Sequence, residues 1–482
     1  MNSQRPSDRR PPTRLGSICV VVGLRWCLLG LLLFSGSRAL RGQATFSTIL
    51  TNGPASNRLN IVFLSEGYTT NQLAQFLVAA TNAANILVTN QPFAEYRPYF
   101  NAYVIAVPSV ESGSDHPNDG LFKKTYFNST YGYSDYIMSI PPDDFDVNYN
   151  NGQGKVDALL NTYMPSCDLA VLLVNDSRIG GSDGGGKVAI AAVSSSLGDI
   201  LLHECGHVVA NLGDEYATPY PGFPDTEEPN TTRETNRTAI KWNAWISTNT
   251  PLPTPPTSQY AGVVGLFEGA HYHATGWYRP RLTCRMASPF TGFFCEVCSE
   301  ALVLSLYRQV RPIDFFTPAG TNLFVTTTQP LNFALTVLQP AAHALSIKWL
   351  VNGTEIAGAT NSVLTVLPAA LGNGTNTVMG RVSDLTPLVR TDTSNLLSQT
   401  LTWTVTVNLP HLQLSAPRWL GDGKFTFRIN GVAPQGFAIH VSTNLSAWTS
   451  IATNNLVNGQ SDYTDQSGAD IPIRMFRAMA LP

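Results

Sequence analysis

The chain has 482 residues, of which 43% are hydrophobic and 13% are charged, and its formal net charge is −3 at pH 7. This share of apolar residues excludes a disordered chain, and the length is sufficient for about three domains. No cluster of lysine and arginine is present in the sequence, which argues against nucleic-acid binding, because that function requires concentrated positive charge to neutralise phosphates.

The first 44 residues differ in composition from the rest of the chain. A basic, polar start is followed by a mostly apolar run at residues 15–34 and by small residues that offer a cleavage point near Ala44. This order predicts a secretory signal peptide. A transmembrane anchor is the alternative, but Arg25 in the middle of the run would be costly at bilayer depth. We therefore expect export and removal of residues 1–44, with no stable membrane span afterwards.

Strand and helix signals alternate in the next part of the chain. Four segments have the apolar runs expected of strands, at residues 58–69, 99–109, 168–176 and 187–195. The run at residues 168–176 is so continuous that its strand should be buried on both faces. Residues 71–89 carry apolar side chains at helical spacing. This alternation is typical of an α/β (α+β) domain, which we expect over residues 45–312.

The stretch HECGHVVANLGDEY, residues 203–216, combines two histidines with acidic residues. Apolar residues recur before it at helical spacing, and Ser196 is placed to cap the helix. In such a helix His203 and His207 lie one turn apart on the same face, where both imidazoles can bind one zinc ion at about 2.0–2.1 Å. Glu204 lies near that face and can act as the general base for the water that zinc activates.

A catalytic zinc ion needs a third protein ligand. Asp214 is seven residues beyond His207, and in a continued helix it would lie ~10 Å along the axis, so the chain must fold back to bring it to the metal. Gly213 is placed to allow this turn, because glycine accepts positive φ. We expect Asp214 to be the ligand. Glu215 is the alternative, either as the ligand or as a group that orients one of the histidines.

The pattern changes after about residue 312. Threonine, asparagine, valine and glycine dominate, and turn signals such as Asn352-Gly353 separate short alternating segments. Residues 313–409 therefore predict an immunoglobulin-like β-sandwich. Residues 410–482 predict a second, smaller β-sandwich, with Trp448 as a core aromatic. By analogy, we expect these modules to bind a matrix, a glycan or a cell surface.

These segments resemble the IgA-peptidase family of bacterial zinc metallopeptidases. HECGHVVANLGDEY resembles the family's HExxH…L-x-DEY signature, IVFLSEGYT its early strand and turn, and DLAVLLVNDSRIGGSDGGG the strand and Gly-rich loop before the zinc helix. LFEGAHYHATGWYRPRLTCRM and FFCEVCSEAL resemble its later segments, including a Cys-x-x-Cys helix start. The resemblance covers about residues 55–308 and leaves the two β modules outside it.

The resemblance implies a metzincin-like zinc peptidase with the catalytic residue Glu204 and the metal ligands His203, His207 and Asp214. In such a fold Met286 is expected to form an apolar floor beneath the metal. Substrate is expected to bind as an extra strand along a sheet edge, for which residues 187–195 are our candidate. The chain departs from the usual metzincin pattern at Gly213, where a histidine ligand is common.

The cysteines and one tyrosine complete the set of candidates. Cys205 lies within the motif but off the ligand face, and we assign it to helix packing. Because an exported chain can keep disulfides, we expect Cys284 to be bonded to Cys295 or Cys298, with a redox or metal-binding Cys-x-x-Cys pair as the alternative. A tyrosine or histidine among His271, Tyr272, His273 and Tyr278 could stabilise the oxyanion of the reaction. Of these we prefer Tyr278, with core packing as the alternative.

Together these features predict a secreted zinc endopeptidase that acts on proteins or peptides outside the cell or in the periplasm. Two alternatives remain open. One is a binding or adhesion protein on a catalytically silent peptidase scaffold, and the other is a zinc amidase that acts on cell-wall material. The intact Glu204 argues against the silent scaffold, because such a protein has no chemical need for that acid.

Overall fold

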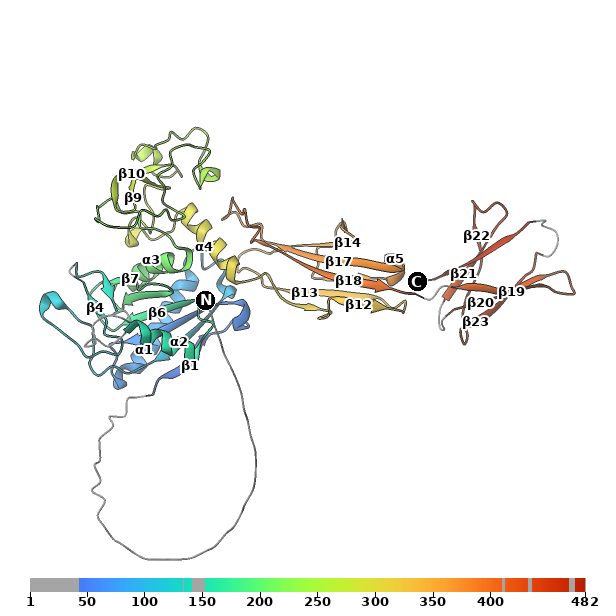
Figure 1. Ribbon diagram of the computed structural model, residues 1–482, viewed down its shortest axis with the longest axis horizontal. Helices are drawn as coiled ribbons and strands as arrows, with labels where there is room; N and C mark the ends of the chain where they lie inside the picture. The colour runs from blue at the N-terminus through green and yellow to red at the C-terminus, as the bar shows by residue number, and fades with distance from the viewer. Residues whose placement is uncertain are drawn as a thin grey trace, which may run out of the picture. The chain divides into compact units, whose positions relative to one another are not determined.

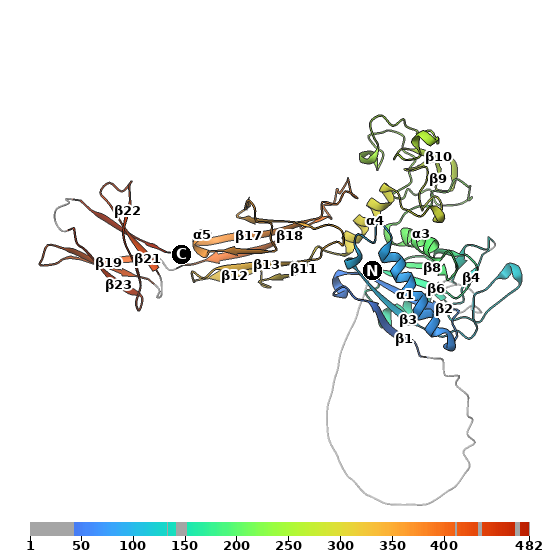
Figure 2. The ribbon, with the colours of Figure 1, turned by 180° about the vertical axis from the view of Figure 1, so that it is seen from behind.

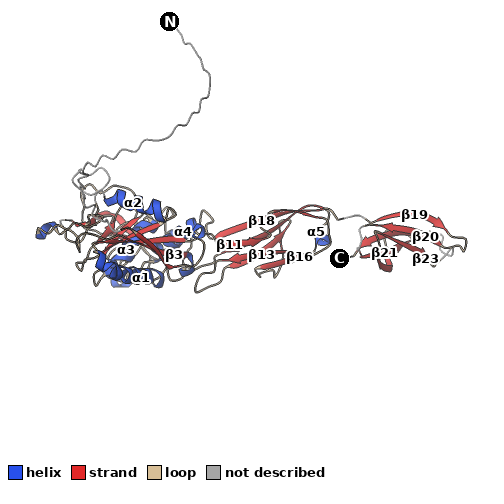
Figure 3. Ribbon diagram, turned by 90° about the horizontal axis from the view of Figure 1, so that it is seen from below, coloured by secondary structure: helices blue, strands red, loops and turns tan. Residues whose placement is uncertain are grey.

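The computed structural model describes residues 43–132, 134–140, 152–409, 412–431, 436–467 and 473–481. The expected signal peptide, residues 1–44, lies outside this part of the chain except for its last two residues. Among the residues described, no helix is long and apolar enough to cross a membrane. Helices and strands alternate up to about residue 312, and the rest is built almost entirely of strands (Figure 3).

A six-stranded sheet forms the centre of the α/β part, with the strand order β1-β3-β2-β6-β8-β7. Its members are β1 (Thr45–Leu50), β2 (Leu59–Glu66), β3 (Phe100–Ala106), β6 (Leu169–Val174), β7 (Gly181–Asp183) and β8 (Val188–Ala192). The four inner strands run parallel, whereas β1 and β7 are antiparallel to their neighbours. β2, β6 and β8 are buried at every position, as expected of parallel strands covered on both faces. The four strands predicted from the sequence are therefore confirmed.

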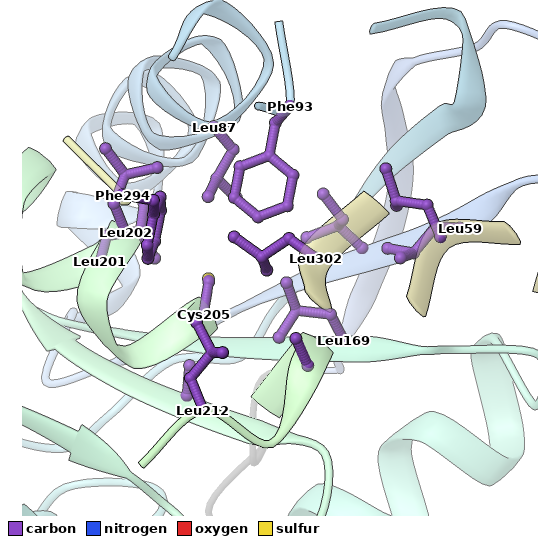
Figure 4. Packing of buried hydrophobic residues seen from close by; sticks show 14 of the residues in the cluster. Leu59, Leu87, Phe93, Leu169, Leu201, Leu202, Cys205, Leu212, Phe294 and Leu302 are labelled. Carbon is purple, nitrogen blue, oxygen red and sulfur yellow. The ribbon is translucent and has the colours of Figure 1, made fainter. Parts of the chain in front are cut away.

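Helices cover both faces of this sheet (Figures 1 and 2). Their bounds are α1 (Leu73–Thr89), α2 (Gly152–Tyr163), α3 (Leu197–Ala210) and α4 (Glu296–Gln309). Alternate residues of β2 enter two separate cores: Ile61 and Phe63 pack with α1, α3 and α4, and Val62 and Leu64 pack with α2. In the first core Cys205 lies among leucines of several elements (Figure 4), fully buried, as expected of a packing residue.

The edge of the sheet differs from the expectation. β8 lies between β6 and β7, so the proposal of residues 187–195 as the edge strand is wrong. The edge is β7, which comes from the Gly-rich segment. An added Cβ at Gly181 would lie 2.3 Å from Ile200 Cγ2 and 2.9 Å from the Ile190 carbonyl oxygen. Glycine is therefore required where β7 passes close to α3, which explains why a strand has the composition of a loop.

The connections in this part contain short elements. The strands are β4 (Thr130–Tyr131), β5 (Met138–Ser139), β9 (Phe267–Ala270) and β10 (His273–Arg279). The 3₁₀ helices are η1 (Ala55–Asn57), η2 (Thr70–Gln72), η3 (Arg97–Tyr99), η4 (Pro117–Asp119), η5 (Asn243–Trp245), η6 (Ser258–Tyr260) and η7 (Pro289–Thr291). Most of the segment between α3 and α4 is irregular, and β9 and β10 form its hairpin.

Two sheets form the first β module. One contains β11 (Ile313–Thr317), β13 (Leu331–Val337) and β16 (Val363–Val366), and the other β12 (Asn322–Val325), β14 (Ser346–Val351), β15 (Thr354–Glu355), β17 (Gly374–Ser383) and β18 (Ser398–Val407). The short helix α5 (Pro368–Leu371) precedes β17. The two sheets share a core that contains Phe333, Trp349 and Trp403, all fully buried. Asn352 and Gly353, both with positive φ, make the predicted turn between β14 and β15.

The second β module also has two sheets. They are formed by β19 (Gln413–Trp419), β20 (Phe425–Asn430) and β23 (Gln460–Asp465), and by β21 (Gly436–Ser442), β22 (Thr449–Asn455) and β24 (Met475–Ala480). Phe427, Ile429 and Phe437 lie in its core. Trp448 does not, contrary to the expectation. Its ring is half-buried on the surface, and the Arg477 guanidinium lies 4.4 Å from the ring centroid. This cation–π contact stabilises the large aromatic ring at the surface.

Buried polar contacts join the α/β part to the first β module. Asp384, 3% exposed, accepts hydrogen bonds from the hydroxyls of Tyr96 and Tyr307 at 2.8 and 2.7 Å. The ring of His343 is 2.7 Å from the same carboxylate. The two regions belong to one compact unit. The chain therefore makes contacts across the change in composition near residue 312.

Candidate metal centre

Helix α3 brings the two histidines of the motif together. The Nε2 atoms of His203 and His207 lie 3.2 Å apart. The Nδ1 atom of His203 is 2.9 Å from the carbonyl oxygen of Arg285, and that of His207 is 2.6 Å from the carbonyl oxygen of Leu212. Because each carbonyl requires a donor, both Nδ1 atoms carry the hydrogen and both Nε2 lone pairs face the same point. Two such lone pairs repel each other unless a cation lies between them.

The chain turns back after α3 at a residue other than the expected one. α3 ends at Ala210, and Asn211 has a φ of 50°, with its N–H directed to carbonyls of the last helical turn. Asparagine tolerates this left-handed conformation, so the expectation that Gly213 provides positive φ is wrong. Gly213 is required for space instead, because an added Cβ would lie 2.4 Å from Glu228 Oε2. Ser196 precedes α3 but makes no side-chain capping bond.

This turn places Asp214 against the histidines. Its Oδ1 atom lies 3.1 Å from His203 Nε2 and 3.5 Å from His207 Nε2. Oδ1 is buried and has no hydrogen-bond partner, whereas Oδ2 accepts a hydrogen bond from the Tyr272 hydroxyl. Burial alone would raise the pKa of Asp214, but the two neighbouring imidazoles lower it well below its usual range. The carboxylate is therefore ionised and directs a free oxygen at the two nitrogens.

The three atoms fit a tetrahedral metal ion. Ligands held about 2.0–2.1 Å from zinc at tetrahedral angles lie about 3.3 Å from one another. The three observed separations are 3.1, 3.2 and 3.5 Å. Two imidazole nitrogens and one carboxylate oxygen are also a donor set that zinc accepts. Glu215, the alternative ligand, points away from the histidines, and its Oε1 accepts a hydrogen bond from Asn230 at 2.9 Å.

Glu204 lies beside the same point. One of its oxygens and a ring nitrogen of each histidine all lie within 4.8 Å of one another. Burial raises the pKa of Glu204, and the opposing effect of the two histidines leaves it at about 7. A carboxyl group with this pKa can accept a proton and return it near neutral pH.

These groups open into a cleft of about 400 Å³. β7 lines one part of it, and Tyr216, Tyr272 and Phe290 line another. The Tyr216 hydroxyl lies 3.2 Å from His203 Nε2. Sequence reasoning assigned no role to Tyr216, although it ends the DEY motif, and it preferred Tyr278 to Tyr272. Tyr278, the sequence candidate, lies in the core instead, and its backbone pairs with Thr232.

Met286 and the cysteines lie beneath the helix. Met286 is fully buried, and a Cβ at Gly206 of α3 would lie 3.0 Å from its sulfur, so it packs directly under the motif. The expected disulfide of Cys284 is not formed. Cys284 and Cys298 have their Sγ atoms 3.7 Å apart, and every described cysteine is free. A disulfide requires about 2.05 Å.

Comparison with known proteins supports one family. A family model described as IgA Peptidase M64 matches residues 48–260 and 256–306. No curated protein matches the chain. Among solved structures, β-glucuronidase 3 of Bacteroides uniformis is 10% identical to this chain, with a TM-score of 0.14. The match covers 43% of this chain and 27% of that enzyme. Fibronectin(III)-like modules of Clostridium thermocellum CbhA are 11% identical over 34% of this chain and 84% of theirs, with a TM-score of 0.15. At such low scores neither likeness carries an argument.

Proposed function

Because the chain belongs to the IgA peptidase M64 family, whose model matches more than half of its residues, we propose that it is a secreted, zinc-dependent endopeptidase with a metzincin-like catalytic part. The observation that carries this proposal is the convergence of His203, His207 and Asp214, whose free lone pairs face one point beside Glu204. No cation of the described chain occupies that point, so the three residues are suited to hold a metal ion.

Zinc is the metal that we propose, with His203, His207 and Asp214 as its ligands. Imidazole and carboxylate ligands suit it, and three protein ligands leave a position open for chemistry. When bound there, zinc supplies Lewis acidity, which polarises a peptide carbonyl and lowers the pKa of water.

Glu204 is the catalytic residue of the proposal. With its pKa at about 7, it takes the proton from the attacking water and then delivers it to the amine that leaves as the peptide bond breaks. The Tyr272 hydroxyl donates to Oδ2 of Asp214 and so keeps Oδ1 directed at the histidines. The Tyr216 hydroxyl faces the same point and is placed to donate to the oxyanion that develops on the carbonyl.

The substrate is a protein or peptide segment in an extended conformation. A cleft of about 400 Å³ that is bordered by the edge strand β7 is suited to a strand-like segment. We propose that the chain is divided as the sequence predicts. The segments are a signal peptide at residues 1–44, the catalytic part at 45–312, an immunoglobulin-like module at 313–409 and a second β module at 410–482. The modules would hold the enzyme on a matrix, a glycan or a cell surface.

Cleavage of an unfolded protein tests the proposal. The exported chain is expected to cleave casein, to lose activity with a chelator and to regain it with zinc. Glu204→Gln should lower kcat by at least about a hundredfold without changing the metal content. Glu268→Gln removes an exposed carboxylate outside the cleft and is the matched control, with activity unchanged. If Glu204→Gln cleaves casein as fast as the unsubstituted chain, the proposal is wrong.

A further inference from the structure

Four buried donor atoms gather among residues that do not line the cleft. They belong to Glu215, Cys284, Cys295 and Cys298, and all lie within 4.8 Å of one another. Cys295 is the N-cap residue of α4 and Cys298 lies in its first turn, whereas Cys284 lies two residues before Met286 in a loop. The three cysteines are at most 1% exposed and Glu215 is 2% exposed.

The separations match a metal site that is rich in sulfur. Cys284 Sγ lies 3.7 Å from Cys298 Sγ, and Cys298 Sγ lies 3.6 Å from Glu215 Oε1. Thiolates bound to zinc at about 2.3 Å lie about 3.8 Å apart when the angles are tetrahedral. The backbone N–H of Cys295 donates to Cys284 Sγ at 3.3 Å, a contact that stabilises negative charge on that sulfur.

A disulfide does not account for this arrangement. It would use two of the three sulfurs and would leave the Glu215 carboxylate buried without a cation. Glu215 Oε2 is buried and has no hydrogen-bond partner. No ion pair involves Glu215 in the described part of the chain, and the nearby Arg279 guanidinium donates to the carbonyls of Glu268 and Gly269 instead. An ionised carboxylate buried in this way would be stabilised by a positive charge at the cluster.

We propose that Glu215, Cys284, Cys295 and Cys298 bind a second divalent metal ion, zinc by its preference for thiolates, in a closed structural site. Four protein ligands leave no position for substrate, so the site ties α4 and the loop before Met286 to the segment that carries Asp214. This proposal uses none of the residues that we assign to catalysis and does not rest on the peptidase function.

Cobalt substitution of the exported chain tests the site directly. Co²⁺ bound by three thiolates gives a sulfur-to-metal charge-transfer band that imidazole and carboxylate ligands do not give. We expect this band in the cobalt-loaded chain, and we expect Cys298→Ser to abolish or strongly weaken it. Cys167→Ser is the matched control, because Cys167 is also buried but lies in the other core. Its cobalt spectrum should equal that of the unsubstituted chain.

Two results would overturn the proposal. One is a metal-replete chain without the thiolate band, and the other is a disulfide between any two of the three cysteines in peptides from the non-reduced protein. If Cys298→Ser does not fold, sulfur neighbours of zinc in the X-ray absorption spectrum of the unsubstituted chain give the same answer. A thiolate band in a chain that cleaves no protein would support this site and contradict the proposed function, so the two proposals fail separately.

Discussion

Two pairs of buried carboxylates in this chain have opposite surroundings. Glu66 and Asp384 have both oxygens occupied by donors of the chain: hydroxyls and backbone N–H groups around Glu66, and hydroxyls, an imidazole and a backbone N–H around Asp384. Asp214 and Glu215 each keep one buried oxygen without a hydrogen bond. Since buried polar groups are nearly always paired, the second pair indicates positions for cations, and the first pair shows what a purely structural acid looks like.

The neighbours Asp214 and Glu215 also differ from each other. Asp214 faces two imidazoles and a cleft, where we propose three protein ligands and space for substrate. Glu215 faces three buried sulfurs. An open site with three ligands is typical of catalysis, and a closed site with four is typical of structure. One peptide bond therefore separates the two metal sites that we propose.

Substituting each of these two acids should separate the two sites, and this is the largest effect that we expect. Asp214→Asn should lower peptidase activity more than about a hundredfold. This exceeds the loss typical when a residue that only hydrogen-bonds to a metal ligand is replaced. The same substitution should leave the cobalt–thiolate band unchanged. Glu215→Gln should alter that band and lower the melting temperature. Activity assays and cobalt spectra on the same preparations check both, and an Asp214→Asn variant with full activity would contradict the assignment of the cleft.

Removing the hydroxyl of Tyr272 should weaken the cleft site alone. This hydroxyl donates to the oxygen of Asp214 that does not face the histidines, so Tyr272→Phe should lower zinc affinity at the cleft by about 10–100-fold. Competition with a chromogenic chelator measures the change. Tyr220→Phe is the matched control, because Tyr220 packs against the Tyr272 ring but is 61% exposed. Equal affinities for the two variants would show that the hydroxyl has no such role.

The next prediction concerns the close packing at Gly213, which directly precedes Asp214 and Glu215 in the chain. Gly213→Ala should lower the free energy of unfolding by about 1–3 kcal/mol, as overpacking typically does. The added Cβ would meet Glu228 Oε2, which the Thr231 hydroxyl and His271 hold in place. Chemical denaturation measures the loss. Gly262→Ala, where nothing lies within 4 Å of an added Cβ, should leave stability nearly unchanged.

The smallest effect that we expect is a pH dependence of stability, which arises from His343 beside the fully hydrogen-bonded carboxylate of Asp384. Burial lowers the pKa of His343, but its contacts with Glu95 and Asp384 raise it above the usual value. A raised pKa means that this contribution to stability is full below the unfolded value of about 6.5 and is lost as pH rises through the folded value. We expect a change below about 1 kcal/mol. Melting temperatures at pH 6 and 9 should differ less in His343→Gln than in the unsubstituted chain, and an equal difference would contradict this.

The sequence predicts the elements that depend on periodic pattern or on a fixed spacing. The four parallel strands follow from continuous apolar runs. The shared face of His203 and His207 follows from helical geometry. The choice of Asp214 over Glu215 as the third ligand stays a prediction. These inferences use local rules, so they do not require knowledge of distant contacts.

The remaining features depend on partners that are far apart in the chain. The edge strand β7 has the composition of a loop, and only its approach to Ile200 explains its glycines. The left-handed turn falls at Asn211 rather than at Gly213. Both residue types tolerate this conformation, so the sequence alone does not indicate which of them adopts it. The sulfur cluster joins Glu215 to cysteines about 70 residues or more further along the chain, a distance at which spacing motifs give no signal.

The burial of the three sulfurs has a consequence for how fast metal leaves the protein. A chelator can enter the cleft, but it reaches the cluster at Cys284 only when α4 or its loop opens, because the sulfur-bearing residues are at most 1% exposed. If both proposed sites hold zinc, it should therefore be released in two kinetic phases. The first phase should end catalysis within a folded chain, and the second should follow the rate of local unfolding. A protein that has lost its activity to a chelator is thus expected to remain folded and ready to be reactivated.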